Sequence, residues 1–237
     1  MVTTTATEPM ATSTTDCTAD ASLALFAWLS PTYPVGAYAY SHGLEHAVEQ
    51  GAVHDGATLE AWIAALLIHG SGRNDSIVFA AAHRAEDDLP AIAELAVALA
   101  ASRERRLETL QQGAAFLAAT RAAWPCETLE RRAALIGADT AYPVCFALAA
   151  AAHHMPLRPA LDGFLAAFAS NLVSGAVRMS VVGQTEGQRI VARLAPIASS
   201  LAAQAQNATL DDLGGCAFRA DLASFHHETQ NARLFRS

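Results

Sequence analysis

Cysteine is scarce in this chain of 237 residues, and the few cysteines are far apart. They are Cys17, Cys126, Cys145 and Cys216. None forms a C-x-x-C pair, which is the spacing that structural zinc sites and redox motifs use. The start of the chain also lacks the basic and apolar segments of a secretory signal. Both features favour reduced thiols over a disulfide framework, and we expect a cytoplasmic protein.

Long apolar runs and an excess of positive charge are missing as well. No stretch of about 20 residues is free of a charge, a proline or a polar break, as a membrane-spanning helix would require. The formal net charge is −8 and the isoelectric point is near 5.5. An acidic chain is poorly suited to nucleic acid and to anionic membranes, so we expect neither among its partners.

Proline and glycine are sparse, and alternation of β-branched residues is hard to find. Apolar residues, many of them alanine, recur instead at helical spacing. We therefore predict an all-α fold, a single-domain bundle of about eight to ten helices over residues 21–237. Residues 143–152 are apolar nearly all round, which predicts a helix at the centre of the bundle. Residues 1–20 are rich in Thr and Ala and are expected to form a disordered tail.

The ends of several expected helices can be assigned from capping residues. Thr58 is a candidate N-cap for the third helix, and Asn74 or Asp75 for the next one. Thr185 is a candidate N-cap for a later helix.

The apolar pattern also predicts which helix faces are buried. Leu44 and Val48 are expected to face inward, with Glu45 and Glu49 outward. The charge run at residues 102–108, SRERRLE, is expected to be a solvated face whose ion pairs contribute only tenths of a kcal/mol each. The helix that follows is expected to bury Leu107, Leu110, Ala114 and Leu117.

One motif carries recognisable metal chemistry. The segment from His42 to His46, HGLEH, fits H-x-x-E-H, the zinc-binding helix of one class of metallopeptidases. On a helix, the two histidines would share a face, and Glu45 would serve as general base. Gly43 weakens such a helix, and no third ligand identifies itself. The sequence also lacks a G-x-x-x-x-G-K-[ST] loop and a G-x-S-x-G elbow.

Residues 30–48, SPTYPVGAYAYSHGLEHAV, are the most distinctive stretch. Two prolines and a glycine indicate a turn, which leads through three tyrosines into a helix. Loops of this kind often present aromatic anchors to a partner. Packing of the tyrosines into the core accounts for the same composition.

The chain finishes with Arg233, Leu234, Phe235 and Arg236, an apolar pair between two cations. Such an ending either docks on its own core or becomes ordered against a partner. Composition alone does not separate these two interpretations.

Taken in order, several blocks of the sequence resemble the UreF family of urease accessory proteins. The blocks are LSPTYPVGAYAYSHGLEHAVEQGAV, SRERRLE, SNLVSGAVR, GQTEGQR and DLASFHHETQNARLFRS, and the resemblance extends from about residue 23 to residue 237. It implies an all-α homodimer that acts as a scaffold and not as an enzyme. Such a scaffold binds UreD (also called UreH), recruits the GTPase UreG, influences GTP hydrolysis and helps to deliver nickel to the urease apoprotein. No cofactor bound by this chain itself is implied.

The resemblance also implies a set of partner-binding residues, with a C-terminal tail at about residues 225–237 that docks UreD/UreH. The set comprises Pro34, Gly36, Tyr38, Ser41, Gly43, Glu45, Arg178, Gln184, Gln188, His227, Glu228, Arg233, Leu234 and Arg236. His42 and His46 occupy variable positions of the family pattern, which disfavours the zinc interpretation. Two alternatives remain: a zinc metallopeptidase that uses the H-x-x-E-H motif, and a generic helical adaptor without a metal connection.

Overall fold

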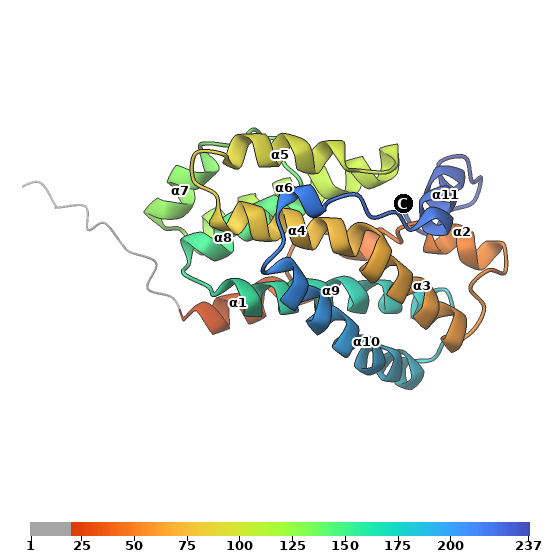
Figure 1. Cartoon of the computed structure of the whole chain (residues 1–237). Coiled ribbons are helices and arrows are strands. Elements are labelled where there is room, and N and C mark those ends of the chain that lie inside the picture. Colours follow the sequence, from red (N-terminus) through yellow and green to blue (C-terminus); the bar gives the residue numbers. More distant parts are fainter. Residues whose placement is uncertain (1–19) are drawn as a thin grey trace, which may run out of the picture.

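The computed structural model describes residues 20–237, and within them it confirms the all-α fold (Figure 1). The tail predicted at residues 1–20 lies outside the described residues, apart from Asp20. The elements are α1 (Ala21–Leu29), η1 (Ala37–Ala39), α2 (Leu44–Glu49), α3 (Gly56–His69), α4 (Ser71–Arg84), α5 (Leu89–Ala98), α6 (Arg103–Ala123), α7 (Glu127–Ala133), α8 (Tyr142–Ala152), α9 (Leu157–Arg178), α10 (Gln184–Ala205), η2 (Leu210–Asp212) and α11 (Phe218–His227).

Helix α8 is the centre of the domain, as its apolar sequence predicts. Nearly all of its side chains are buried, because α4, α6 and α7 pack against it from different sides. Phe146 stacks on Phe116 of α6, with the ring centroids 4.9 Å apart. The edge of Trp28 from α1 meets the same Phe146 ring at 5.7 Å. An aromatic cluster therefore fixes α1, α6 and α8 relative to one another.

Helices α9 and α10 form a long antiparallel pair along one side of the domain (Figure 1). Small residues allow the close approach, since a Cβ added at Gly187 would lie 3.1 Å from Val173. By length and composition alone, α9 is apolar enough to cross a membrane, and half of its most apolar window is buried in this structure. Core helices of soluble proteins have the same composition, so this feature is weak support for a membrane span.

Three of the predicted helix caps are wrong, each for a local reason. Asp55, not Thr58, is the N-cap of α3, and Thr58 completes the capping box from inside the helix. Helix α4 begins directly after Gly70, which places Asn74 and Asp75 within it. Helix α10 begins at Gln184, so Thr185 lies one position inside.

Among the described residues, Cys145 is a buried free thiol and Cys216 is an exposed one, as the sequence predicts for these two cysteines.

Segments from distant parts of the sequence meet at one end of the domain. There α2 lies beside α11, and the C-terminus returns to the same place (Figure 1). The start of α6 joins them, because the hydroxyls of Ser102 and Ser224 of α11 are 2.6 Å apart. This end holds most of the residues predicted to bind partners.

Candidate partner-binding site

The two residues before α2 have a left-handed backbone conformation, so they do not belong to the helix that the zinc motif requires. His42 and Gly43 have φ angles of 56° and 74°, and α2 begins only at Leu44. A Cβ at Gly43 would lie 2.7 Å from the backbone nitrogen of Ser224, so glycine lets α2 and α11 approach closely. His42 therefore lies outside the helix that H-x-x-E-H requires.

The two histidines of the motif also point into different surroundings. The Nε2 atom of His42 is 2.9 Å from Glu108, and the ring meets the edge of Phe168 at 5.0 Å. His46 instead stacks on His226, with centroids 5.3 Å apart. Among the described residues, no group of three or more His, Cys, Asp or Glu side chains could hold a metal ion. The geometry gives the metallopeptidase alternative no support.

The charge run at the start of α6 is a buried polar face, which corrects the prediction of a solvated one. Ser102 caps the helix, and Glu104, Glu108 and Gln112 follow at intervals of four residues on the inward side. Leu107, expected to be buried, is 47% exposed. The carboxylates turn inward because His42, His227 and the C-terminal residues supply partners from outside α6.

Glu108 is the centre of this polar face. It pairs with Arg105, and it accepts hydrogen bonds from Gln112 at 2.9 Å and from the hydroxyl of Ser237 at 2.9 Å. Burial alone would raise the pKa of Glu108, but the charge of Arg105 and the contact with His42 lower it to about 2. Burial, together with Arg105, lowers the pKa of His42. At neutral pH the carboxylate is thus ionised and bound on several sides.

Glu45 faces inward as well, although the helical pattern predicts an outward side chain. Its carboxylate accepts hydrogen bonds from the backbone N–H groups of Leu234, at 2.5 Å, and Phe235, at 2.9 Å. The same carboxylate lies 3.1 Å from Nε2 of the fully buried His227, whose Nδ1 lies 2.7 Å from Glu104. Each ring nitrogen of His227 is thus within hydrogen-bond distance of a different carboxylate. Glu45 and His227 therefore tie the tail, α2, α6 and α11 together.

The C-terminal residues are docked on their own domain. Arg236 donates its N–H to the carbonyl of Ala39 at 2.8 Å, and Ser41 donates its N–H to Ser237 at 2.6 Å. The ring of Phe235 is 3% exposed and lies under the guanidinium of Arg178, 4.4 Å from the ring centroid. The composition allows the tail either to dock on its own core or to become ordered against a partner. In the structure the tail packs on its own core.

Docking leaves part of the tail outside. Leu234 is 62% exposed, and Arg236 is exposed. Arg233 is held by Glu104 at 2.7 Å and by the carbonyls of Gln230 and Glu228. Glu228 in turn accepts the backbone N–H of Arg103 at 2.9 Å. The predicted partner-docking segment is therefore an ordered ridge that keeps Leu234 and Arg236 on the surface.

The three tyrosines of the loop differ in exposure: two pack against the domain, and one is exposed to solvent. Tyr33 is half-buried and its hydroxyl is 2.8 Å from Thr120, while the buried Tyr40 donates to Gln111. Tyr38, in η1, is 69% exposed. Gly36 supplies the left-handed turn before η1, with φ 71°. The loop is packed by two tyrosines and presents the third.

The remaining predicted site residues lie apart from the tail. Gln184 and Gln188 are exposed at the start of α10, and no hydrogen bond joins them to the tail in the described structure. Pro34 is exposed in the turn before η1. Pro34, Gln184 and Gln188 thus lie apart, whereas the structure brings together Tyr38, Ser41, Gly43, Glu45, Arg178, His227, Glu228, Arg233, Leu234 and Arg236.

Sequence reasoning missed the inward partners of the tail. The sequence predicts that Glu104, Arg105 and Glu108 face solvent and indicates His42 as a metal ligand, whereas the structure buries Glu104, Glu108 and His42. The signal available was the four-residue spacing of Glu104, Glu108 and Gln112, which puts all three on one helix face.

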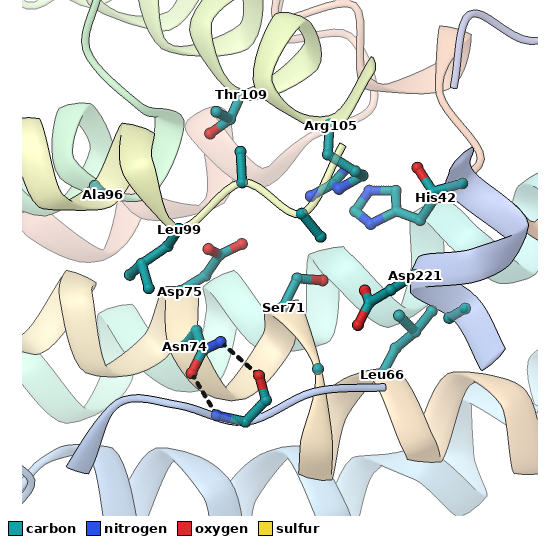
Figure 2. Close-up of a pocket in the computed structure, with 16 residues that line it drawn as sticks. His42, Leu66, Ser71, Asn74, Asp75, Ala96, Leu99, Arg105, Thr109 and Asp221 are labelled. Atoms are coloured by element: carbon teal, nitrogen blue, oxygen red, sulfur yellow. Dashed lines mark hydrogen bonds between the residues drawn. The ribbon is translucent and has the colours of Figure 1, made fainter. Parts of the chain in front are cut away.

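A small polar cavity lies behind this network, as Figure 2 shows. Its volume is about 70 Å³, room for a few water molecules, and His42, Asp75 and Arg105 turn toward the same space. The buried Nδ1 atom of His42 has no hydrogen-bond partner within residues 20–237. Burial raises the pKa of Asp75 to about 6. On the cavity wall, Asn74 fixes the chain before α11 through hydrogen bonds with Gly215.

Exposed apolar side chains gather at the same end of the domain. Phe218, Leu222 and Phe225 are 67%, 40% and 49% exposed, and their spacing aligns them along one face of α11. Leu234 and Tyr38 add to them from the tail and from η1. An apolar helix face left in solvent is typical of a protein–protein interface.

Comparison with known proteins gives a consistent result. The model of the UreF family matches residues 53–195. The urease accessory protein UreF of Xanthobacter autotrophicus is 56% identical over 220 residues, which cover 91% of this chain and 90% of that protein. The UreF protein of Methylobacterium sp. is 52% identical over 91% of this chain and 88% of its own length. Urease accessory protein UreF 1 of Brucella canis is 48% identical over 92% of this chain and 94% of its own length.

Proposed function

We propose a role for this chain from one premise: the chain belongs to the UreF family of urease accessory proteins. In this proposal the chain is a non-enzymatic scaffold in urease maturation. It bridges UreD/UreH and the GTPase UreG, and it assists nickel insertion into the urease apoprotein.

One observation carries the proposal beyond family membership. Exposed apolar side chains of α11, the docked tail and η1 lie at the end of the domain where α2, α11 and the C-terminus meet, and we take them as one apolar surface. Behind this surface, the carboxylates of Glu45, Glu104 and Glu108 contact backbone N–H groups, arginines and histidines. They hold the surface in shape, which is what a scaffold requires.

In the proposal, Glu45 and Arg178 act on the GTPase through the shape of this surface. Glu45 binds the backbone of the tail, and Arg178 covers Phe235. A change at either residue would therefore move the tail, and any gating of GTP hydrolysis would follow from that displacement.

The proposal also places the chain in the cytoplasm as a homodimer that binds neither nucleic acid nor membrane. Nickel passes through the assembly, and this chain holds no cofactor of its own. The net charge of −8 supports the absence of nucleic-acid partners.

Co-purification with UreD/UreH tests the proposed surface. Leu222→Asp with Phe225→Asp puts two charges on the exposed face of α11 and should abolish the complex, because both side chains would be desolvated in it. Leu135→Asp, at a 46% exposed position outside this surface, is the matched control and should bind like the wild type. Complex formation by the double variant would exclude the α11 face. No complex with the wild-type chain would contradict the role itself.

A further inference from the structure

A shallow pocket lies where the docked tail meets the first turn of α6. Its volume is about 390 Å³, and it is lined by Arg103, Glu104, Leu107, Arg233, Phe235 and Arg236. The pocket exists only while the tail is docked, because three of the lining residues belong to the tail. It is separate from the polar cavity behind Glu108.

The free charges of this pocket are positive. Glu104 and Arg233 neutralise each other at 2.7 Å. The guanidinium of Arg103 makes no ion pair within residues 20–237, and Arg236 lies beside the Tyr40 hydroxyl without a carboxylate partner. Arg103 and Arg236 are thus two lining cations without an ion-pair partner among the described residues, and the nearby Glu228 carboxylate is bound to the backbone N–H of Arg103 at 2.9 Å.

The position of the arginines is unfavourable for α6 itself. Arg103, Arg105 and Arg106 all lie in its first turn, where the helix dipole favours acidic residues. Arg105 is compensated by Glu108. Arg103 and Arg106 have no such partner in the described chain. Helix stability therefore does not account for the cations at the pocket.

The rest of the lining is apolar. Leu107, 47% exposed, faces the pocket from α6, and the ring of Phe235 closes its base. Leu234 continues the apolar surface on the tail. A ligand that fits must offer a carboxylate to Arg103 and Arg236 and an apolar side chain to Leu107.

We propose that this pocket receives an acidic segment of the partner protein, with a carboxylate between the two arginines and an apolar neighbour against Leu107. The inference rests on the proposed function and deepens it, because it assigns a chemistry to the partner segment. The tail then acts as half of a binding pocket.

The test measures the affinity of the full-length chain for purified UreD/UreH in 50 mM and 300 mM NaCl. We expect the wild type to bind more weakly at the higher salt, because salt screens the charge pairs. Arg103→Glu with Arg236→Glu should lower the affinity at least tenfold in 50 mM NaCl and remove most of the salt dependence. Arg131→Glu, at an exposed arginine of α7, is the matched charge control and should leave affinity unchanged.

Each outcome decides the inference. If the wild type binds and the double variant binds equally well, the acidic-segment proposal is wrong while the scaffold role stands. If the double variant instead loses self-association and keeps UreD/UreH, the pocket belongs to a second copy of this chain, and the proposal is overturned. If the wild type does not bind UreD/UreH at all, both proposals fail.

Discussion

Glu45 joins parts of the chain that are far apart in the sequence. One carboxylate serves the backbone of Leu234 and Phe235 and the ring of His227, 182 residues from it. Helical periodicity predicts that the Glu45 side chain faces solvent. Its hydrogen-bond partners are far away in the sequence, so no local pattern indicates them. The inward carboxylates of α6 escaped prediction for the same reason. Periodicity reports apolar faces, and it does not report a polar face that is completed by distant segments.

Replacing Glu45 with Gln should free the tail while leaving the helices intact. Hydrogen bonds to a charged group contribute about 1.5–3 kcal/mol, so the amides of Leu234 and Phe235 should exchange roughly ten- to a hundredfold faster. Hydrogen exchange by NMR or mass spectrometry measures this, with Glu49→Gln, an exposed position on the same helix, as control. Unchanged exchange in the Glu45 variant would mean that Phe235 alone holds the tail.

Asp75 should make stability depend on pH in a defined window. Its pKa rises from 3.8 to about 6 on folding, so between pH 4 and pH 6 the unfolded side chain loses its proton first. The folded state therefore loses stability as the pH rises through this window.

Asp75→Asn should remove the cost of holding an ionised carboxylate in the folded state. We expect the free energy of unfolding at pH 7.5 to rise by about 1–2 kcal/mol, less than the full pKa shift implies, because the side chain keeps some contact with solvent. The gain should vanish below pH 4. Urea unfolding at several pH values measures it, with the exposed Asp139→Asn as reference. A gain that is the same at every pH would contradict the assignment.

At the scale of elements, the sequence predicts best where a helix is apolar on every side. Residues 143–152 could only form a central helix, and α8 is that helix. Helix boundaries were harder, because Thr58, Asn74 and Thr185 all have capping chemistry but lie inside their helices. The true N-caps lie two to four residues upstream: Asp55 caps α3 with its side chain, whereas Gly70 and Gly183 carry no side-chain signal.

The packing of α2 on α11 should depend on a single glycine. Gly43→Ala combines a left-handed φ with a Cβ 2.7 Å from the backbone of Ser224, which cannot rotate away. We expect a loss of about 2–5 kcal/mol in the free energy of unfolding, from backbone strain and overpacking together.

Gly36 provides the comparison, since its φ is 71° but a Cβ there meets nothing within 4 Å. Gly36→Ala should cost only about 1–2 kcal/mol, the strain alone. Chemical denaturation of both variants separates the two contributions. Equal losses would show that α2 and α11 have room to move apart.

At the scale of the whole molecule, the match to the family model and the proposed contact surface lie in different parts of the chain. The family model covers residues 53–195, from just before α3 into α10, whereas the tyrosine loop and the tail lie outside that range. The full-length relatives extend the match to about 91% of the chain. Resemblance predicted the all-α fold, and it could not indicate that the tail folds back onto α2 and α6.

The central claim is that this chain supports urease maturation through that surface and without chemistry of its own. The most direct test is the nickel content of urease produced from an operon that lacks its UreF gene, with this chain supplied in trans. We predict that the wild-type chain and the Leu135→Asp variant restore nickel occupancy and urease activity, while Leu222→Asp with Phe225→Asp restores neither. Full nickel occupancy without this chain, or with the double variant, would contradict the claim.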